Sequence, residues 1–177
     1  MIISAMLKYN KAEELLKKYG GGYSLNVGSG NHNFPADINT DKDTDDLNGK
    51  LQYADSTFDT VTAFQVIEHL DNPYNAIKEI RRILKPKGHF IFSIPNTWNL
   101  QNRLLFLFKG EMDRYRSNNG HQVIFTHKTF KDFIKGFKLV EKGYLHKTFP
   151  LNKIPKLRSF IKTGMLQSQV VYFVIEK

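Results

Sequence analysis

A glycine-containing turn, Gly28-Ser29-Gly30, follows an apolar segment that is typical of a β-strand. Because glycine has no side chain to block access, its backbone can approach a ligand closely. Asp41 and Asp46 follow a short distance along the chain. The turn is compatible with a ligand that approaches the backbone closely, and also with an ordinary turn that ends a strand. The aspartates that follow are compatible with a solvated acidic loop.

The spacing after this turn argues against a dinucleotide cofactor. Asn33 stands where the third glycine of a dinucleotide fingerprint would be. Ten residues separate Gly30 from Asp41, and they must hold a loop and a short strand. A crossover helix does not fit there as well, since a complete crossover needs about 10–12 residues or more. A pyrophosphate would then lack the helix N-terminus that normally receives it, whereas a nucleoside without phosphates would not need one.

Histidine is the side chain best suited to take a proton near neutral pH. If the chemistry removes a proton from a hydroxyl, His121 is our first candidate base and His69 the second, ahead of His127 and His32. A lone histidine is also compatible with a structural or merely exposed role. Glu68 and His69 are interpreted either as a helix-capping pair or as substrate contacts. The His, Asp and Glu spacings match no metal-ligand motif, so no catalytic metal is predicted.

Apolar periodicity alternates between strands and helices, which favours an α/β fold with a parallel sheet and crossover helices. Asn10 and Glu13 predict a capping box for a short first helix that ends at Gly20, and Asn72 and Pro73 predict the start of another. We expect helices at about 10–18, 73–84, 100–108 and 128–135, with the segment 85–88 ending the second. We expect strands at about 23–27, 36–39, 57–66, 89–94, 138–145 and 167–175.

Composition limits the class of protein. The 177 residues, 41% of them hydrophobic, predict a single domain with a real core over residues 1–177. The absence of cysteine excludes disulfides and thiolate metal sites and fits the cytoplasm, which is the location we expect. No apolar stretch approaches the roughly 20 residues needed to cross a bilayer. The net charge of +9 favours anionic partners such as nucleic acid, although a solvated basic face is the simpler interpretation.

Several segments, in order, resemble the motifs of class I S-adenosylmethionine-dependent methyltransferases. The similar segments are Leu25–Gly30 (first motif), Ile38–Asp41 (acidic second-strand end), Asp46–Asp59, Gln65–Leu70 ("VLEHL"), Ala76–Gly88 (helix and "RvLKPGG" turn) and Ser93–Asn96 ("StPN"). The resemblance covers about residues 23–145. Gly120-His121, with Phe125-Thr126, further resembles the type 11/23-like branch that holds ubiquinone-biosynthesis and sugar or lipid O-methyltransferases. The short segment after Gly30 resembles a compact form with a shortened first helix.

The resemblance implies a Rossmann-like, doubly wound α/β fold. Its sheet would be mostly parallel with an antiparallel last strand, and helices would cover both faces. The implied cofactor is S-adenosylmethionine, with Gly28, Ser29 and Gly30 passing under its methionine part. Gln65 would lie at the end of the central strand, near the methionine end of the cofactor or the substrate.

The same resemblance assigns the acidic residues. Asp41 would accept hydrogen bonds from the ribose hydroxyls, with Asp37 as its rival. Asp46 would face the adenine amino group, with Asp45 as its rival. The backbone amide of Leu47 would be offered to a ring nitrogen of the adenine.

The implied activity is methyl transfer to an oxygen of a small molecule, either a sugar, a lipid or a quinone-like phenol. The basic charge leaves RNA methylation as an alternative, although the segment 93–96 is not an Asn-Pro-Pro-Tyr-like motif. A non-catalytic S-adenosylmethionine-binding protein is a third interpretation. We expect residues 1–22 to form an N-terminal helix, 97–127 a substrate cover and 146–166 a basic linker. Cover and linker are apolar and basic, which would also suit peripheral contact with an anionic membrane.

Overall fold

The computed structural model describes residues 2–30, 34–115, 120–147 and 164–177. Within these residues the strands form one six-stranded sheet with the order β2-β1-β3-β4-β6-β5. The strands are β1 (Ser24–Val27), β2 (Ile38–Thr40), β3 (Phe58–Phe64), β4 (Leu84–Pro95), β5 (Lys138–Lys147) and β6 (Ser168–Glu176). Strands β1 to β4 are parallel to one another, and β6 is antiparallel to both β4 and β5. The predicted mostly parallel sheet with an antiparallel last strand is confirmed.

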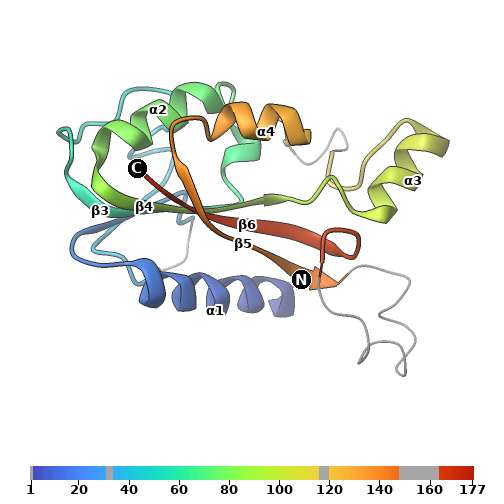
Figure 1. Cartoon of the computed structure of the whole chain (residues 1–177), viewed down its shortest axis with the longest axis horizontal. Helices are drawn as coiled ribbons and strands as arrows, with labels where there is room; N and C mark the ends of the chain where they lie inside the picture. The colour runs from blue at the N-terminus through green and yellow to red at the C-terminus, as the bar shows by residue number, and fades with distance from the viewer. Residues whose placement is uncertain (1, 31–33, 116–119, 148–163) are drawn as a thin grey trace.

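Helices cover both faces of this sheet, as predicted. Helix α1 (Ile2–Tyr19) lies along one face, and α2 (Pro73–Ile83) and α4 (His127–Phe133) lie along the other (Figure 1). Helix α3 (Leu100–Lys109) follows β4 and lies beyond the end of the sheet (Figure 1). A 3-10 turn, η1 (Ile67–His69), follows β3.

The alternation of side chains along β4 divides the core into two layers. Phe90 and Phe92 belong to the large cluster that α2 and α4 cover, where the ring centroids of Phe130 and Phe173 are 4.2 Å apart. Ile91 points to the other face, where it packs with Leu15 of α1. Because successive residues of a strand face opposite sides, a continuous apolar strand is buried on both faces only when helices cover both.

The predicted start of α2 is confirmed. The side chain of Asn72 accepts a hydrogen bond from the amide of Asn75 at 3.0 Å, and Pro73 occupies the first turn. The end of the helix differs from the prediction. Leu84 is the first residue of β4 and pairs with Phe58, so the segment 85–88 is an irregular part of that strand. The apolar spacing of the helix extends to Leu84, but backbone pairing of Leu84 with β3 ends the helix before it.

The predicted start of α1 is wrong, because the helix begins at Ile2 and Asn10 is an exposed residue inside it. Its end is as predicted, and the amide of Gly20 donates to the carbonyl of Leu16 at 2.6 Å. Helix α1 is tied to β5 by Glu141, which accepts hydrogen bonds from Lys18 and Tyr19. These bonds, Lys18 first, lower the pKa of Glu141 to about 2.

The connection between β1 and β2 contains no helix in its described residues, 28–30 and 34–37, as the spacing predicted. The short link brings Asp41, just after β2, close to the glycine turn after β1. None of the described helices is both long enough and apolar enough to cross a membrane.

Candidate functional site

A cavity of about 300 Å³ lies beyond the carboxyl ends of β1, β2 and β3. Ligands of open α/β sheets bind at this edge, where successive loops diverge. We call it the carboxyl-end cavity, and its lining residues are Val27, Gly28, Gly30, Asp41, Lys42, Asp45, Asp46, Leu47, Asn48, Gln65, Val66, His69 and Leu70. The structure thus brings together most of the residues that the sequence assigned to a cofactor. Ser29 and His121 are the two assigned residues outside this lining.

The glycine turn forms one wall of the carboxyl-end cavity. Gly28 has a φ of 74°, and a Cβ added there would lie 2.4 Å from Cγ2 of Val66. The amides of Gly28 and Ser29 both donate to the carbonyl of Thr40, at 2.8 and 2.9 Å. A Cβ added to Gly30 would meet no atom within 4 Å. Gly28 is therefore required by close packing, while Gly30 borders open space.

Asp41 and its rival Asp37 lie at opposite ends of β2. Asp41 follows the strand and lines the carboxyl-end cavity, and its Oδ1 accepts a hydrogen bond from the amide of Lys42 at 2.7 Å. Asp37 precedes the strand and accepts hydrogen bonds from the amide and the hydroxyl of Ser24, both at 2.7 Å. These bonds lower the pKa of Asp37. Of the two aspartates, Asp41 therefore lines the carboxyl-end cavity and Asp37 does not.

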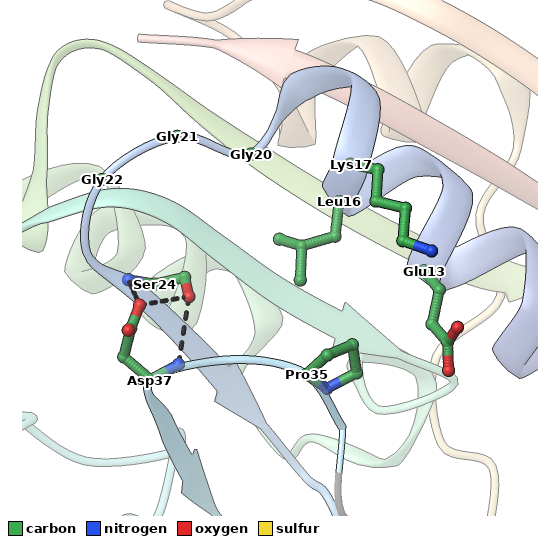
Figure 2. A pocket seen from close by; sticks show the side chains of 9 residues that line it. All are labelled: Glu13, Leu16, Lys17, Gly20, Gly21, Gly22, Ser24, Pro35 and Asp37. Atoms are coloured by element: carbon green, nitrogen blue, oxygen red, sulfur yellow. Dashed lines mark hydrogen bonds between the residues drawn. The ribbon is translucent and has the colours of Figure 1, made fainter.

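Asp37 lines a second cavity of about 300 Å³, which we call the amino-end pocket. Figure 2 shows Asp37 and Ser24 joined by hydrogen bonds on one side of it and side chains of α1 on another. Its lining residues are Glu13, Leu16, Lys17, Gly20, Gly21, Gly22, Ser24, Pro35 and Asp37. This pocket lies before the amino ends of β1 and β2, so it is separate from the carboxyl-end cavity.

Asp45 and Asp46 both line the carboxyl-end cavity. Oδ1 of Asp46 accepts hydrogen bonds from the amide and the side chain of Asn48, at 2.9 and 3.1 Å, which shapes the loop locally. Asp45 accepts a 2.6 Å hydrogen bond from the hydroxyl of Tyr53. Burial, together with this bond, raises the pKa of Tyr53. Leu47 belongs to the main hydrophobic core and lines the cavity, with 2% of its surface exposed.

Gln65 follows β3 with a φ of 58°, a left-handed conformation that is uncommon outside glycine. Such residues are enriched at binding sites, where the surrounding structure enforces them. The amide of Gln65 donates to the carbonyl of Ser93, and its Oε1 accepts a 3.0 Å hydrogen bond from Arg114. Arg114 was not among the predicted site residues. Because it lies 49 residues further along the chain, no local spacing could have indicated it.

The two histidines proposed as bases lie side by side. The ring centroids of His69 and His121 are 4.6 Å apart, and the ring of Tyr115 is 5.3 Å from that of His121. Glu68, beside them, is completely buried. Burial, with the nearby Glu68 carboxylate, raises the pKa of Tyr115. His69 lines the carboxyl-end cavity, so this cluster borders the candidate cofactor site.

The segment expected to cover the substrate, residues 97–127, is described except for 116–119. Helix α3 within it leaves Leu107 and Phe108 largely exposed, at 73% and 77%. The residue just before this segment is held in place by its buried side chain. The side-chain amide of Asn96 donates to the carbonyls of Met165 and Ser168, both at 2.7 Å. Most of the expected basic linker, 148–163, lies outside the described residues.

Comparisons with known proteins identify a methyltransferase-like segment and fold. Residues 26–92, from β1 to β4, match the family described as a methyltransferase domain. Among curated sequences, an uncharacterized protein of Methanocaldococcus jannaschii, MJ0638, is 36% identical over 91 residues, 51% of this chain. The aligned part spans only 35% of that relative.

Solved structures show the same fold. An S-adenosylmethionine-dependent methyltransferase of Thermotoga maritima, TM1293, superposes with a TM-score of 0.64 and 17% identity, over 97% of this chain and 88% of that one. One of Archaeoglobus fulgidus superposes with a TM-score of 0.61 and 13% identity, over 99% and 98%. The chain therefore has the Rossmann-like fold of these solved structures, and residues 26–92 match a methyltransferase domain family.

Proposed function

We propose that this protein is a methyltransferase that uses S-adenosylmethionine and methylates an oxygen of a small molecule. The observation that carries the proposal is the convergence of the glycine turn, Asp41 and Asp46 on one cavity at the carboxyl ends of the strands. The match of residues 26–92 to a methyltransferase domain supports the same reaction class.

The residues around the carboxyl-end cavity fit S-adenosylmethionine. The open space at Gly30 admits the methionine part close to the backbone. Asp41 would accept the two ribose hydroxyls, and Asp46 with the amide of Leu47 would face the adenine. When bound, the cofactor would supply a methyl group on its sulfonium sulfur. The acceptor oxygen would form a bond to this methyl group as the sulfur–methyl bond breaks, and the acceptor proton would pass to a base. Gln65, held by Arg114, would position the methionine end.

The acceptor would be held between the cavity and the segment 97–127. Alignment of acceptor and methyl group supplies much of the acceleration in such a transfer. His121 is the candidate base for the acceptor proton, and His69 is the alternative. The exposed apolar residues of α3 support an acceptor with an apolar part, a lipid or a quinone-like phenol, over a bare sugar.

Calorimetry with S-adenosylhomocysteine tests the cofactor site. We expect binding by the wild type and a loss of about 1.5–3 kcal/mol in Asp41→Asn, because charge-assisted hydrogen bonds to the ribose are lost. Asp43→Asn is the matched control, since it removes the same charge from an exposed position of the same loop outside the cavity lining. No binding by the wild type, or equal affinity in both variants, would refute the assignment.

Transfer of labelled methyl from S-adenosylmethionine then tests the reaction. We expect product with phenol or lipid acceptors. Product only with RNA, together with RNA binding that weakens steeply with salt, would instead establish the alternative function. Cofactor binding without transfer to any acceptor class would support a non-catalytic protein.

A further inference from the structure

Three side chains of metal-ligand type meet beside the carboxyl-end cavity. Glu68, His69 and His121 each offer one ligand atom, and these atoms all lie within 4.8 Å of one another. The first two belong to η1 and the third lies 52 residues further along the chain. The three residues form no motif of closely spaced ligands in the sequence, so the sequence predicted no metal site.

The backbone holds the two segments in register. The carbonyl of Glu68 accepts hydrogen bonds from the amides of Gln122 and Val123, at 2.8 and 3.3 Å. Nδ1 of His69 lies 3.1 Å from the carbonyl oxygen of Gly120. These contacts fix the position of His121 relative to the η1 turn, so the cluster follows from the fold and not from a chance meeting of surface side chains.

The contact to Gly120 also sets the tautomer of His69. A carbonyl oxygen only accepts hydrogen bonds, so Nδ1 must carry the proton and donate it. In the neutral ring, the other nitrogen, Nε2, then has a lone pair for a ligand. Metal-binding histidines characteristically donate one ring N–H to a backbone carbonyl or a carboxylate, which orients the other nitrogen toward the metal.

Glu68 is the most deeply placed member of this group. The residue has no exposed surface, while His121 is half-buried and His69 is exposed. One carboxylate oxygen and two imidazole nitrogens are a ligand set that a divalent cation accepts. Two nitrogen ligands and one oxygen ligand suit first-row transition metals better than Mg²⁺ or Ca²⁺, which prefer oxygen alone.

We propose that Glu68, His69 and His121 bind a divalent transition-metal cation at the edge of the carboxyl-end cavity. Three protein ligands leave coordination positions open, and His69 lines the cavity, so those positions would be accessible to an acceptor oxygen. A metal ion acidifies an oxygen that binds it. In the metal-bound protein, His121 is then a ligand and the cation replaces it in promoting loss of the acceptor proton. Only this use of the cation rests on the proposed function.

Titration of the untagged chain with Co²⁺, followed by calorimetry and visible absorption, tests the site without cofactor or acceptor. We expect one Co²⁺ per chain, with absorption bands of nitrogen and oxygen ligation. His121→Ala, His69→Ala and Glu68→Gln should each weaken binding by roughly tenfold or more, since even the partners of metal ligands contribute about 10–100-fold. Circular dichroism checks that each variant is folded, and the half-buried His121 keeps the test decisive if Glu68→Gln does not fold.

His89→Gln is the matched control. His89 pairs with Thr60 near the amino end of β3, at the opposite end of that strand from the cluster, so its loss should leave Co²⁺ affinity unchanged. Absence of Co²⁺ binding by the wild type, or equal affinity in wild type and His121→Ala, would overturn the proposal. S-adenosylhomocysteine binding in the same preparation distinguishes this failure from a failure of the proposed function.

Discussion

Strands β1 and β2 have a cavity of about 300 Å³ at each end, one past their carboxyl ends and one before their amino ends. Both cavities contain an aspartate adjacent to β2 and at least two glycines. At the amino end, Asp37 is bonded to Ser24 and joins the two strands. At the carboxyl end, Asp41 is bonded locally to Lys42 and faces a cavity with further acids. Similar residues thus join two strands at one end and border an open cavity at the other.

The direction of the strands explains the difference. Loops that leave the carboxyl ends of neighbouring parallel strands diverge and leave space between them. At the amino ends, the turn after α1 enters β1 directly, and Asp37 uses its carboxylate to satisfy the amide and hydroxyl of Ser24. A carboxylate engaged in this way contributes to the fold, whereas one bordering a cavity is available to a ligand.

The largest expected difference between the two regions concerns their glycines. Gly28→Ala should destabilise the protein by about 2–4 kcal/mol, because the new Cβ meets Val66 and the backbone is left-handed. Gly21→Ala, in the amino-end pocket, should change stability by less than about 0.5 kcal/mol, because its Cβ would meet nothing within 4 Å. Urea unfolding measures both. Equal losses would contradict the close approach at Gly28.

A smaller effect is expected for Gly30 and Gly22, two glycines with similar backbone conformations but different surroundings. Gly30 and Gly22 have similar positive φ values, 55° and 62°. Gly30→Ala should lower the affinity for S-adenosylhomocysteine several-fold, since its Cβ enters the open space of the carboxyl-end cavity. Gly22→Ala should lower stability only, because its Cβ meets the carboxylate of Asp59, which holds the amide of Tyr23. Reduced affinity in Gly22→Ala alone would reverse the roles of the two cavities.

The smallest expected effect is the pH dependence at the amino end. Hydrogen bonds from Ser24 lower the pKa of Asp37 below its usual 3.8 in the folded protein. The stabilisation is therefore present above the pKa of the unfolded chain and is lost as pH falls through the folded pKa. Asp37→Asn should be less stable than the wild type at pH 6, and this difference should shrink toward pH 2. Urea unfolding at several pH values measures the difference, and a constant gap would disprove the ionic contribution.

The sequence was a sufficient guide wherever the information is local. The glycine turn and the cap at Asn72 follow from residue type and spacing over a few positions, and the structure agrees. The same holds for the lack of a helix in the described residues before Asp41, 34–40. Predicted boundaries were wrong at Asn10 and Leu84, where favourable local signals lose to continuation of α1 and to pairing with β3. A single capping motif or apolar stripe stabilises a helix boundary less than the hydrogen bonds of a continuing helix or a paired strand stabilise the alternative.

By itself, the sequence determined the succession of strands and helices along the chain and the placement of glycines and acids at strand ends. These features depend on residues that are near neighbours in the chain. Tertiary structure alone decided which aspartate faces the carboxyl-end cavity, that Arg114 reaches Gln65, and that His121 meets Glu68 and His69. The physical reason is that side chains far apart in sequence meet only after the sheet is paired and its helices are packed against both faces.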